Sequence, residues 1–331
     1  MNALVTGAGG FLGLYVVEQL VARGDRVRAM CRGNDPRLES LGVEIVHADL
    51  RDRTAVVRAC QTMDVAFHVG GVAGMNGPWL PYYETNVLGT SHVIDGCRTH
   101  GVGRLVYTSS PSVTFDGRDQ NGIDESTPYP KRWLCHYARS KGLAEQQVLA
   151  ASGCDGLLTC ALRPHLIWGP RDRHLLPTIF DRARTGRLCR VGDGSNRVDT
   201  SYVENVATAH LQAADALRPG SCVAGRAYFI SQGEPVNCWQ WINRVLTMAG
   251  LPPIHKSISR RAAWWLGAGC EAFYGLLRRK DEPPMSRFLA AELSSSHFFD
   301  IRRARQDFGY APRISTAEGL RRLAASWNAS S

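Results

Sequence analysis

The sequence lacks the residue spacings that hold metal ions or disulfide frameworks. Its ten cysteines are spread from Cys31 to Cys270, and no two of them form a Cys-x-x-Cys pair. Its ten histidines include no His-x-x-x-His and no His-Glu-x-x-His spacing. We therefore expect no catalytic metal, and we expect the thiols to be free, as in proteins of a reducing compartment.

Leader segments and long apolar runs are also missing. The first apolar run already begins at residue 3, so no signal peptide precedes it, and the chain is expected to be cytoplasmic. Of the 331 residues 44% are hydrophobic, and the C-terminal third contains neither a repeat nor a low-complexity linker. These values fit one large α/β domain, alone or with a smaller lobe, and they exclude a disordered chain.

Acidic residues are outnumbered, with 39 Lys and Arg against 30 Asp and Glu, and the formal net charge is +9. Ten of the cations and five of the acids lie between Lys256 and Arg305, so the excess is concentrated towards the C-terminus. The basic residues are not interleaved with a nucleic-acid-binding motif, so nucleic acid is not an expected partner. An anionic cofactor, an acidic substrate, an anionic membrane surface and a simple solvated face stay open.

Glycine, in contrast, is concentrated at one point near the N-terminus. The apolar run at 3–5 leads into Thr6–Gly13, and a helical apolar pattern follows. A glycine turn between a strand and a helix binds the pyrophosphate of a dinucleotide. Gly7 permits the tight turn, Gly10 the close approach of backbone, and Gly13 the packing of helix on sheet. The cofactor-binding residues that this turn predicts are Gly7, Gly10, Phe11, Leu12 and Gly13.

Strand and helix patterns alternate over the first half of the chain. Further strands are expected at residues 26–31, 43–46, 64–69, 104–108, 157–162 and 227–230. The alternation predicts a doubly wound parallel sheet of the Rossmann type, with a smaller, mostly helical C-terminal lobe, and it gathers the motifs at one sheet edge. We expect a cofactor domain over 1–165 and 198–232, and a substrate lobe over 166–197 and 233–331.

The strand ends bear on the choice of cofactor. The second strand ends in Cys31-Arg32, where an NAD-binding protein would carry an acid, so a 2′-phosphate would meet Arg32 and no carboxylate. NADP(H) is therefore favoured, and NAD(H) is the alternative. Asp49, followed by Leu50, is placed to meet the adenine amino group, and Gly70 lets backbone pass close to the cofactor.

A tyrosine and a lysine stand one helical turn apart at Tyr137 and Lys141. A phenol has a pKa near 10, and a neighbouring ammonium lowers it, so the pair can exchange a proton with a substrate oxygen. Ser110, with Ser109 as the neighbouring alternative, follows the 104–108 strand and can hydrogen-bond a carbonyl oxygen. Asn86 lies upstream of both motifs.

Together these residues resemble the extended short-chain dehydrogenase/reductase family. The glycine turn, Asn86, Ser110, Tyr137 and Lys141 match that family's cofactor turn and catalytic tetrad. The resemblance implies hydride transfer between a nicotinamide and an alcohol or ketone. In that reaction Tyr137 gives or takes the proton and Ser110 holds the oxygen, while Lys141 binds the nicotinamide ribose. Asn86 anchors the backbone and water of the proton relay, and Pro164 lies in the segment 163–172 that closes over the nicotinamide.

Within the family the chain is similar to the 3β-hydroxysteroid dehydrogenase branch. There it resembles bacterial reductases of 2-alkyl-3-oxoalkanoic acids in long-chain olefin biosynthesis, on the stretches 129–137, 228–235 and 282–288. This implies an NADPH-dependent reductase of a bulky apolar ketone, giving a 3-hydroxy acid. A 3β-hydroxysteroid or sterol-4-carboxylate dehydrogenase using NAD(P) is the alternative, although Cys31-Arg32 departs from the acid expected of an NAD-using sterol enzyme. A nucleotide-sugar epimerase or dehydratase and a non-catalytic NADP-sensing protein are the remaining hypotheses.

Other residues give weaker indications of a substrate pocket. The candidates are Ser109, Trp79, Trp168, Arg171 and Trp265. Asp124-Glu125 looks like a paired carboxylate, but its polar surroundings favour a solvated turn.

Residues 261–280 predict an amphipathic helix with basic residues at both ends. The segment is too short and too polar to span a membrane, which needs about 20 apolar residues. A buried core helix is one interpretation. The other is a helix that covers the substrate pocket and rests on a membrane or on a pathway enzyme. A second copy of the chain, forming a homodimer, is a further candidate partner.

Overall fold

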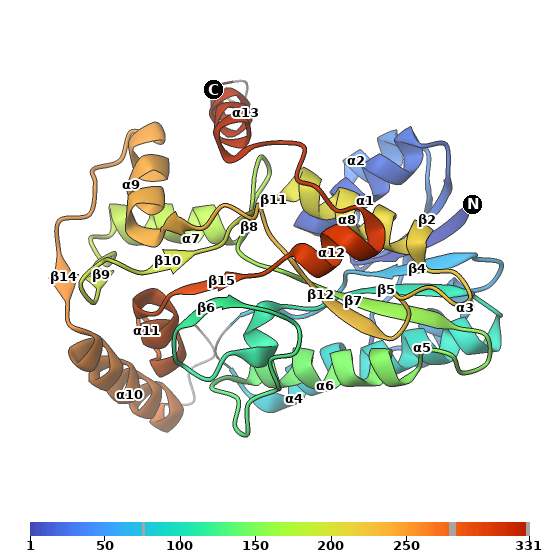
Figure 1. Ribbon diagram of the computed structural model, residues 1–331, viewed down its shortest axis with the longest axis horizontal. Helices are drawn as coiled ribbons and strands as arrows, with labels where there is room; N and C mark the ends of the chain where they lie inside the picture. The colour runs from blue at the N-terminus through green and yellow to red at the C-terminus, as the bar shows by residue number, and fades with distance from the viewer. Residues whose placement is uncertain (75–76, 278–282, 329–331) are drawn as a thin grey trace.

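A seven-stranded parallel sheet forms the centre of the molecule, in a computed structural model that describes residues 1–74, 77–277 and 283–328 (Figure 1). The strands lie in the order β12-β7-β5-β4-β1-β2-β3. Their bounds are β1 Asn2–Thr6, β2 Arg26–Cys31, β3 Glu44–His47, β4 Val65–His68, β5 Arg104–Thr108, β7 Leu158–Pro164 and β12 Arg226–Ile230. The strand order reverses direction between β1 and β4, so the expected doubly wound sheet is confirmed.

Helices cover both faces of this sheet (Figure 1). On one face lie α1 Phe11–Ala22, α2 Pro36–Ser40, α8 Val203–Ala216 and α12 Arg302–Phe308, and on the other α3 Arg53–Ala59, α5 Gly89–Thr99 and α6 His136–Ala150. Successive side chains of a strand point to opposite faces, so Ala3 and Val5 join the first core and Leu4 joins the second. Because both faces are buried, the central strands are mostly apolar.

Two short irregular helices follow the carboxyl ends of central strands. After β4, the helix α4 Trp79–Tyr82 runs into a π-helix at Tyr83–Leu88, which continues as α5. After β5, a 3₁₀ turn spans Pro111–Thr114. These segments place Asn86 and Ser110 at the same sheet edge as the glycine turn.

The lobe is built from a second sheet, in the order β13-β10-β15-β6, and from helices. The strands are β6 Gln120–Ile123, β10 Arg197–Val198, β13 Val236–Asn237 and β15 His297–Phe299, with the short pairs β8 Ile167–Trp168 and β11 Ser201–Tyr202, and β9 Arg190–Val191 and β14 Ser257–Ile258. The helices are α7 Leu175–Arg184, α9 Cys238–Met248, α10 Arg260–Leu276, α11 Arg287–Ser294 and α13 Thr316–Asn328. No helix in the described ranges combines the length and the apolar character needed to cross a bilayer.

The two parts exchange segments more than the sequence suggested. β6, from the range expected in the cofactor domain, pairs with β15 of the lobe. Conversely Ile301, Ala304 and Tyr310, from the range expected in the lobe, lie in the core under α1 and α8. The expected solvated turn at Asp124-Glu125 is wrong for Glu125, because its buried carboxylate accepts a 2.9 Å hydrogen bond from the N–H of Phe229.

A buried ion pair joins α6 to β7. Arg163 donates to Glu145 at 2.6 and 3.0 Å, and the two side chains are only 4% and 0% exposed. The hydroxyl of Tyr129 donates a further 2.7 Å hydrogen bond to the same carboxylate. If one partner of such a pair is removed, the other stays behind as an unpaired buried charge, and the folded state is strongly destabilised. Replacing both partners by apolar side chains avoids this penalty.

Arg163→Met should therefore lower the free energy of unfolding by about 3–5 kcal/mol, because Glu145 loses its cation. The double variant Glu145→Leu/Arg163→Met should be more stable than Arg163→Met, since neither charge is then buried. Urea unfolding followed by circular dichroism measures both. A double variant less stable than the single one would show that the buried charge is not the source of the loss.

Candidate active site

The glycine turn between β1 and α1 leaves a backbone cradle that side chains would fill. Gly7 has a positive φ of 69°, and a Cβ there would lie 2.6 Å from the Cα of Gly70. A Cβ at Gly13 would lie 2.1 Å from the carbonyl oxygen of Gly7. Gly10 contributes no side-chain cap to α1, so the first N–H groups of the helix, from Phe11 onward, are available to an anion. The cradle fits the pyrophosphate of a dinucleotide.

A line of buried hydrogen bonds leads from this turn to the helix that carries Asn86. Gly70 N–H donates to Thr6 Oγ1 at 3.2 Å, and that oxygen lies 2.7 Å from Nδ1 of His68. Nε2 of His68 lies 2.9 Å from Thr90 Oγ1, which donates to the carbonyl oxygen of Asn86 at 2.6 Å. Because the Thr90 proton is used on Asn86, His68 donates from Nε2 and accepts from Thr6 at Nδ1. Burial lowers the pKa of His68 to about 3, so the ring stays neutral.

The Asn86 amide ties the loop after β4 to α6. Its Oδ1 accepts from the N–H of Val72 at 2.7 Å, and its Nδ2 donates to the carbonyl oxygen of Val72 at 3.0 Å. Nδ2 also donates to Ser140 Oγ at 2.9 Å, and Ser140 Oγ donates to the carbonyl oxygen of Tyr137 at 2.9 Å. Asn86 therefore sits where it positions the first turn of α6.

Tyr137 and Ser110 meet at the carboxyl end of β5. Burial raises the pKa of Tyr137 to about 12, and a hydrogen bond with Ser110 offsets part of that rise. Ser110 Oγ also lies 2.9 Å from Ser112 Oγ, which holds the hydroxyl in place. The Ser109 hydroxyl is buried and has no hydrogen-bond partner among the described residues. Of the two serines, Ser110 is the one that contacts Tyr137.

Lys141 lies one turn further along α6 and is buried. Its Nζ donates to the carbonyl oxygen of Thr108 at 2.5 Å and lies 4.3 Å from the centre of the Tyr107 ring. Burial lowers the pKa of Lys141 to about 7, although the charge of Glu145 acts in the opposite direction. The expected lowering of the Tyr137 pKa by Lys141 is not found, because the ammonium is directed at Thr108 and is not among the groups that shift that pKa.

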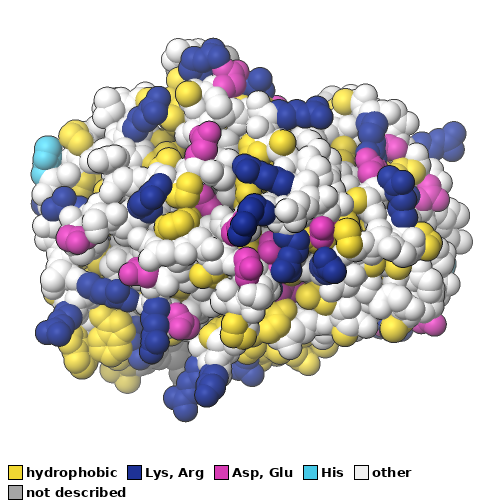
Figure 2. All heavy atoms as spheres, in the orientation of Figure 1, with side chains coloured by type: hydrophobic (Ala, Val, Ile, Leu, Met, Phe, Trp, Pro, Cys, Tyr) yellow, Lys and Arg dark blue, Asp and Glu magenta, His cyan; other side chains and the backbone are white. Residues whose placement is uncertain are grey.

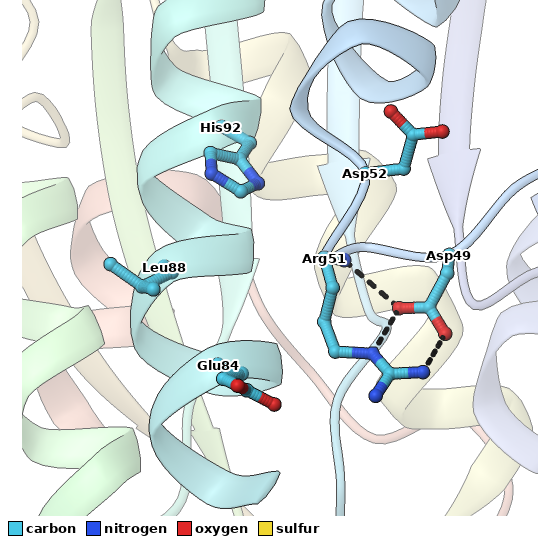
Figure 3. A pocket seen from close by; sticks show the side chains of 6 residues that line it. All are labelled: Asp49, Arg51, Asp52, Glu84, Leu88 and His92. Atoms are coloured by element: carbon cyan, nitrogen blue, oxygen red, sulfur yellow. Dashed lines mark hydrogen bonds and ion pairs between the residues drawn. The ribbon is translucent and has the colours of Figure 1, made fainter. Parts of the chain in front are cut away.

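An open depression lies beside Asp49, the residue expected to meet the adenine (Figure 3). Figure 3 shows its lining, which consists of Asp49, Arg51, Asp52, Glu84, Leu88 and His92. Asp49 accepts from the Arg51 guanidinium at 3.0 and 2.9 Å. Hydrogen bonding to Arg51 is the main cause that lowers the pKa of Asp49, and the charge of Arg32 adds to it. Arg32 therefore lies close enough to act on this end of the site.

An acid that the sequence analysis missed stands beside the glycine turn. Asp35 is buried, and one of its carboxylate oxygens would lie 4.0 Å from a Cβ placed on Gly9. Arg37 donates to it at 2.8 and 2.6 Å, and Arg173 approaches to 3.7 Å. Asp35 is thus neutralised by two cations, while Arg32 is exposed and forms no ion pair with any described residue. The local field therefore stays favourable for a phosphate.

Comparison with known proteins gives these features a context. The profile of the 3-beta hydroxysteroid dehydrogenase/isomerase family matches residues 4–259. The chain belongs to this family. It is 49% identical to a 2-alkyl-3-oxoalkanoate reductase of Stenotrophomonas maltophilia, over 98% of this chain and 99% of that protein. It is 45% identical to a protein of the same name from Shewanella oneidensis, over 98% and 86%. The chain is an oxidoreductase of the extended short-chain dehydrogenase/reductase type.

A solved structure shares the fold over the whole chain. The structure of MoeE5 in complex with UDP-glucose and NAD matches with a TM-score of 0.76 at 25% identity, over 100% of this chain and 99% of that one.

Within the described ranges of this chain, no three His, Cys, Asp or Glu side chains converge into a possible metal site.

The remaining predicted cofactor residues line or support the same sheet edge. Leu12 and Leu50 are buried, and a Cβ at Gly70 would lie 3.1 Å from the Leu50 side chain. Pro164 ends β7, where it pairs in register with Ile230 of β12. Leu12 belongs to the core on one face of the sheet and Leu50 to the core on the other.

The predicted substrate residues are scattered. Trp168 is fully buried between Tyr202 and Trp241, so its expected place at a substrate pocket is corrected to the lobe core. Arg171 forms a bidentate ion pair with Glu18 at 2.6 and 2.8 Å. Trp265 is 69% exposed on α10.

Trp79 lies nearer to Tyr137. Its ring centre is 4.4 Å from the guanidinium of Arg139 and 5.6 Å from the ring of His136, both on the first turn of α6. Trp79 is thus the predicted aromatic that the structure brings beside α6, the helix of Tyr137.

Glu292 of α11 is an acid near Tyr137 that sequence reasoning missed. Its charge acts on Tyr137, Cys135 and Cys238, and burial raises its own pKa to about 7. Its neighbours Phe288 and Ala291 pack on Phe115 with Cys135 beside them, which places α11 against the start of α6. A lone acid more than 150 residues from Tyr137 carries no local motif, so only the fold reveals it.

Proposed function

We propose that this protein is an NADPH-dependent reductase that converts a 2-alkyl-3-oxoalkanoic acid into the corresponding 3-hydroxy acid. The observation that carries the proposal is the contact of Ser110 with Tyr137 on a helix that Asn86 anchors beside the glycine cradle. The substrate class is suggested by the two bacterial relatives at 49% and 45% identity, whose names specify it.

The reduction assigns distinct tasks to the two hydroxyls. A nicotinamide bound in the cradle supplies the hydride to the carbonyl carbon. Ser110 donates a hydrogen bond to the ketone oxygen, and Tyr137 transfers its proton to that oxygen as negative charge develops there. A pKa raised to about 12 keeps Tyr137 protonated at neutral pH, which is the state that a reductase needs at the start of the reaction.

Lys141 and the glycine turn hold the cofactor in this scheme. The glycine turn binds the pyrophosphate, and Lys141 is placed to bind the nicotinamide ribose. Its Nζ would lie 3.9 Å from a Cβ at Gly71, beside the backbone that the cofactor passes. Arg32 takes the 2′-phosphate, since it is an exposed cation directly after β2. A direct test of the whole scheme is NADPH oxidation with 3-oxo acids, 3-ketosteroids and nucleotide sugars in parallel, of which only the 3-oxo acids should support turnover.

Tyr137→Phe should lower kcat by 10²–10⁴-fold, because only the proton donor is lost. The dissociation constant of NADPH, measured by fluorescence titration, should change by less than about twofold, since binding and proton transfer use different groups. A variant that keeps more than about a tenth of the wild-type rate would remove Tyr137 from the role of proton donor.

Arg32→Asp should shift the preference from NADPH towards NADH, because a carboxylate accepts hydrogen bonds from ribose hydroxyls and repels a 2′-phosphate. The quantity to measure is the ratio of kcat/KM for the two cofactors, and it should fall by at least tenfold. Arg53→Ala, which removes an exposed cation from α3, is the matched control and should leave the ratio unchanged. An unaltered ratio in Arg32→Asp would show that the 2′-phosphate is not read there.

Glu292 should make the binding of an anionic substrate depend on pH. Below its pKa of about 7 the carboxyl is protonated and can donate to a substrate carboxylate, whereas above it the ionised group repels that carboxylate. KM for a 3-oxo acid should therefore rise about fivefold or more between pH 6 and pH 8. Glu292→Gln should flatten this rise, and a neutral ketone should show none in either protein. An equal rise in Glu292→Gln would assign the effect to another group.

A further inference from the structure

Helix α10 turns an apolar face to solvent. Ala263 and Gly267 are its buried residues, and a Cβ at Gly267 would lie 2.6 Å from the carbonyl carbon of Ser286 where α10 meets α11. Of nine large hydrophobic side chains that are exposed in the described ranges, six lie between Trp264 and Leu277. A surface helix ordinarily shows the reverse pattern, with charges outward and apolar side chains inward.

From Trp264 to Leu276 the outward face carries no charge. With 3.6 residues per turn, Trp265, Phe273 and Leu276 lie on the side opposite Gly267, and they are 69%, 54% and 82% exposed. The one acid of the helix, Glu271, is turned to α11, where it accepts from Arg287 at 2.6 Å. The apolar face is therefore continuous from Trp264 to Leu276, a length of about 18 Å at 1.5 Å per residue.

The start of α10 lies close to the loop that precedes α6. Arg260, at the start of α10, donates to the carbonyl oxygen of Gly117 at 2.6 Å. A Cβ at Gly117 would lie 3.2 Å from the side chain of Leu134, which is itself 43% exposed. Leu134 is three residues before Tyr137. Through Gly117, the start of α10 is thus linked to the loop that leads into the site.

Cations stand at the rim of this surface. Lys131 and Arg132 precede Leu134, and Arg261 lies at the first turn of α10. All three are exposed and form no ion pair within the part of the chain that the structure describes. Figure 2 shows apolar atoms gathered at the corner where Figure 1 places α10, with Lys and Arg side chains beside them. Residues 278–280, the basic end expected from the sequence, lie outside the described residues.

We propose that α10 and the 131–134 loop form a surface that docks on an anionic lipid bilayer. A helix with bulky apolar side chains on one face and cations at its rim lies in the interface plane, with the apolar face inserted among the acyl chains. Tryptophan is favoured at that depth, and exposed Lys and Arg attract anionic headgroups. Its cations have no ion-pair partner among the described residues, which matches a charged bilayer better than a second, equally basic copy of this chain.

This arrangement has a consequence that rests on the proposed function. A long-chain 3-oxo acid partitions into a bilayer, and the docked surface would place the loop before Tyr137 at the membrane side of the molecule. A substrate could then enter from the bilayer without crossing water. Docking itself requires no particular substrate, so the two claims are tested separately.

The test measures binding of the full chain to vesicles at low salt. Flotation with vesicles of phosphatidylcholine alone and of phosphatidylcholine with phosphatidylglycerol should show at least tenfold more protein on the anionic vesicles. Phe273→Ser/Leu276→Ser should reduce that binding at least tenfold, and Leu80→Ser, an equally exposed leucine outside the surface, should not. Arg261→Glu should reduce it about fivefold, whereas Arg58→Glu on α3 should leave it unchanged.

Circular dichroism of each variant confirms folding, and turnover of a short soluble 3-oxo acid reports on the proposed function independently. Loss of vesicle binding in Phe273→Ser/Leu276→Ser with unchanged turnover of the short acid supports docking. The absence of binding to anionic vesicles, or equal binding by this variant and the wild type, overturns it. A dimer in solution that disappears in this variant also overturns it, because a second copy would then cover the face.

Discussion

The amide of Asn86 is the interaction on which the geometry of the site depends. It holds both backbone groups of Val72 and the hydroxyl of Ser140, so one side chain fixes the loop after β4 and the first turn of α6. The same residue's carbonyl oxygen ends the hydrogen-bond line that begins at the glycine turn. The glycine turn and the start of α6 are therefore held in one connected hydrogen-bond network, which tolerates little displacement of either.

Burial sets the chemistry of the groups that this network positions. It raises the pKa of Tyr137 to about 12 and lowers that of Lys141 to about 7, so both side chains are driven towards their neutral forms. A neutral phenol is ready to give a proton, which suits the reduction of a ketone. Burial also removes water from the Lys141 ammonium group. Hydrogen bonds from this group to ribose hydroxyls would replace the lost contacts with water.

Much of the fold and of the candidate site could be predicted because the relevant residues lie close together in the sequence. Short stretches of sequence suffice to recognise the glycine turn, the alternation of strands and helices, and the spacing of Tyr137 and Lys141. The seven-stranded sheet confirms the expected architecture. Glu125, Asp35 and Glu292 could not be placed, because their surroundings come from distant strands and helices. Trp168 shows the same limit, since its two aromatic neighbours come from other segments of the chain. Charged and aromatic side chains have alternative environments that only tertiary contacts decide.

The central claim is hydride transfer to the ketone carbon of a 3-oxo acid, and isotope transfer tests it most directly. The protein is incubated with NADPH that carries deuterium at C4 of the nicotinamide and with a 2-alkyl-3-oxoalkanoic acid, and the product is analysed by mass spectrometry. With each C4-deuterated epimer of the cofactor tested in turn, the account predicts a 3-hydroxy acid with one deuterium at C3 from one epimer. Oxidation of the cofactor without deuterium at C3, or no 3-hydroxy acid from this substrate, would contradict it.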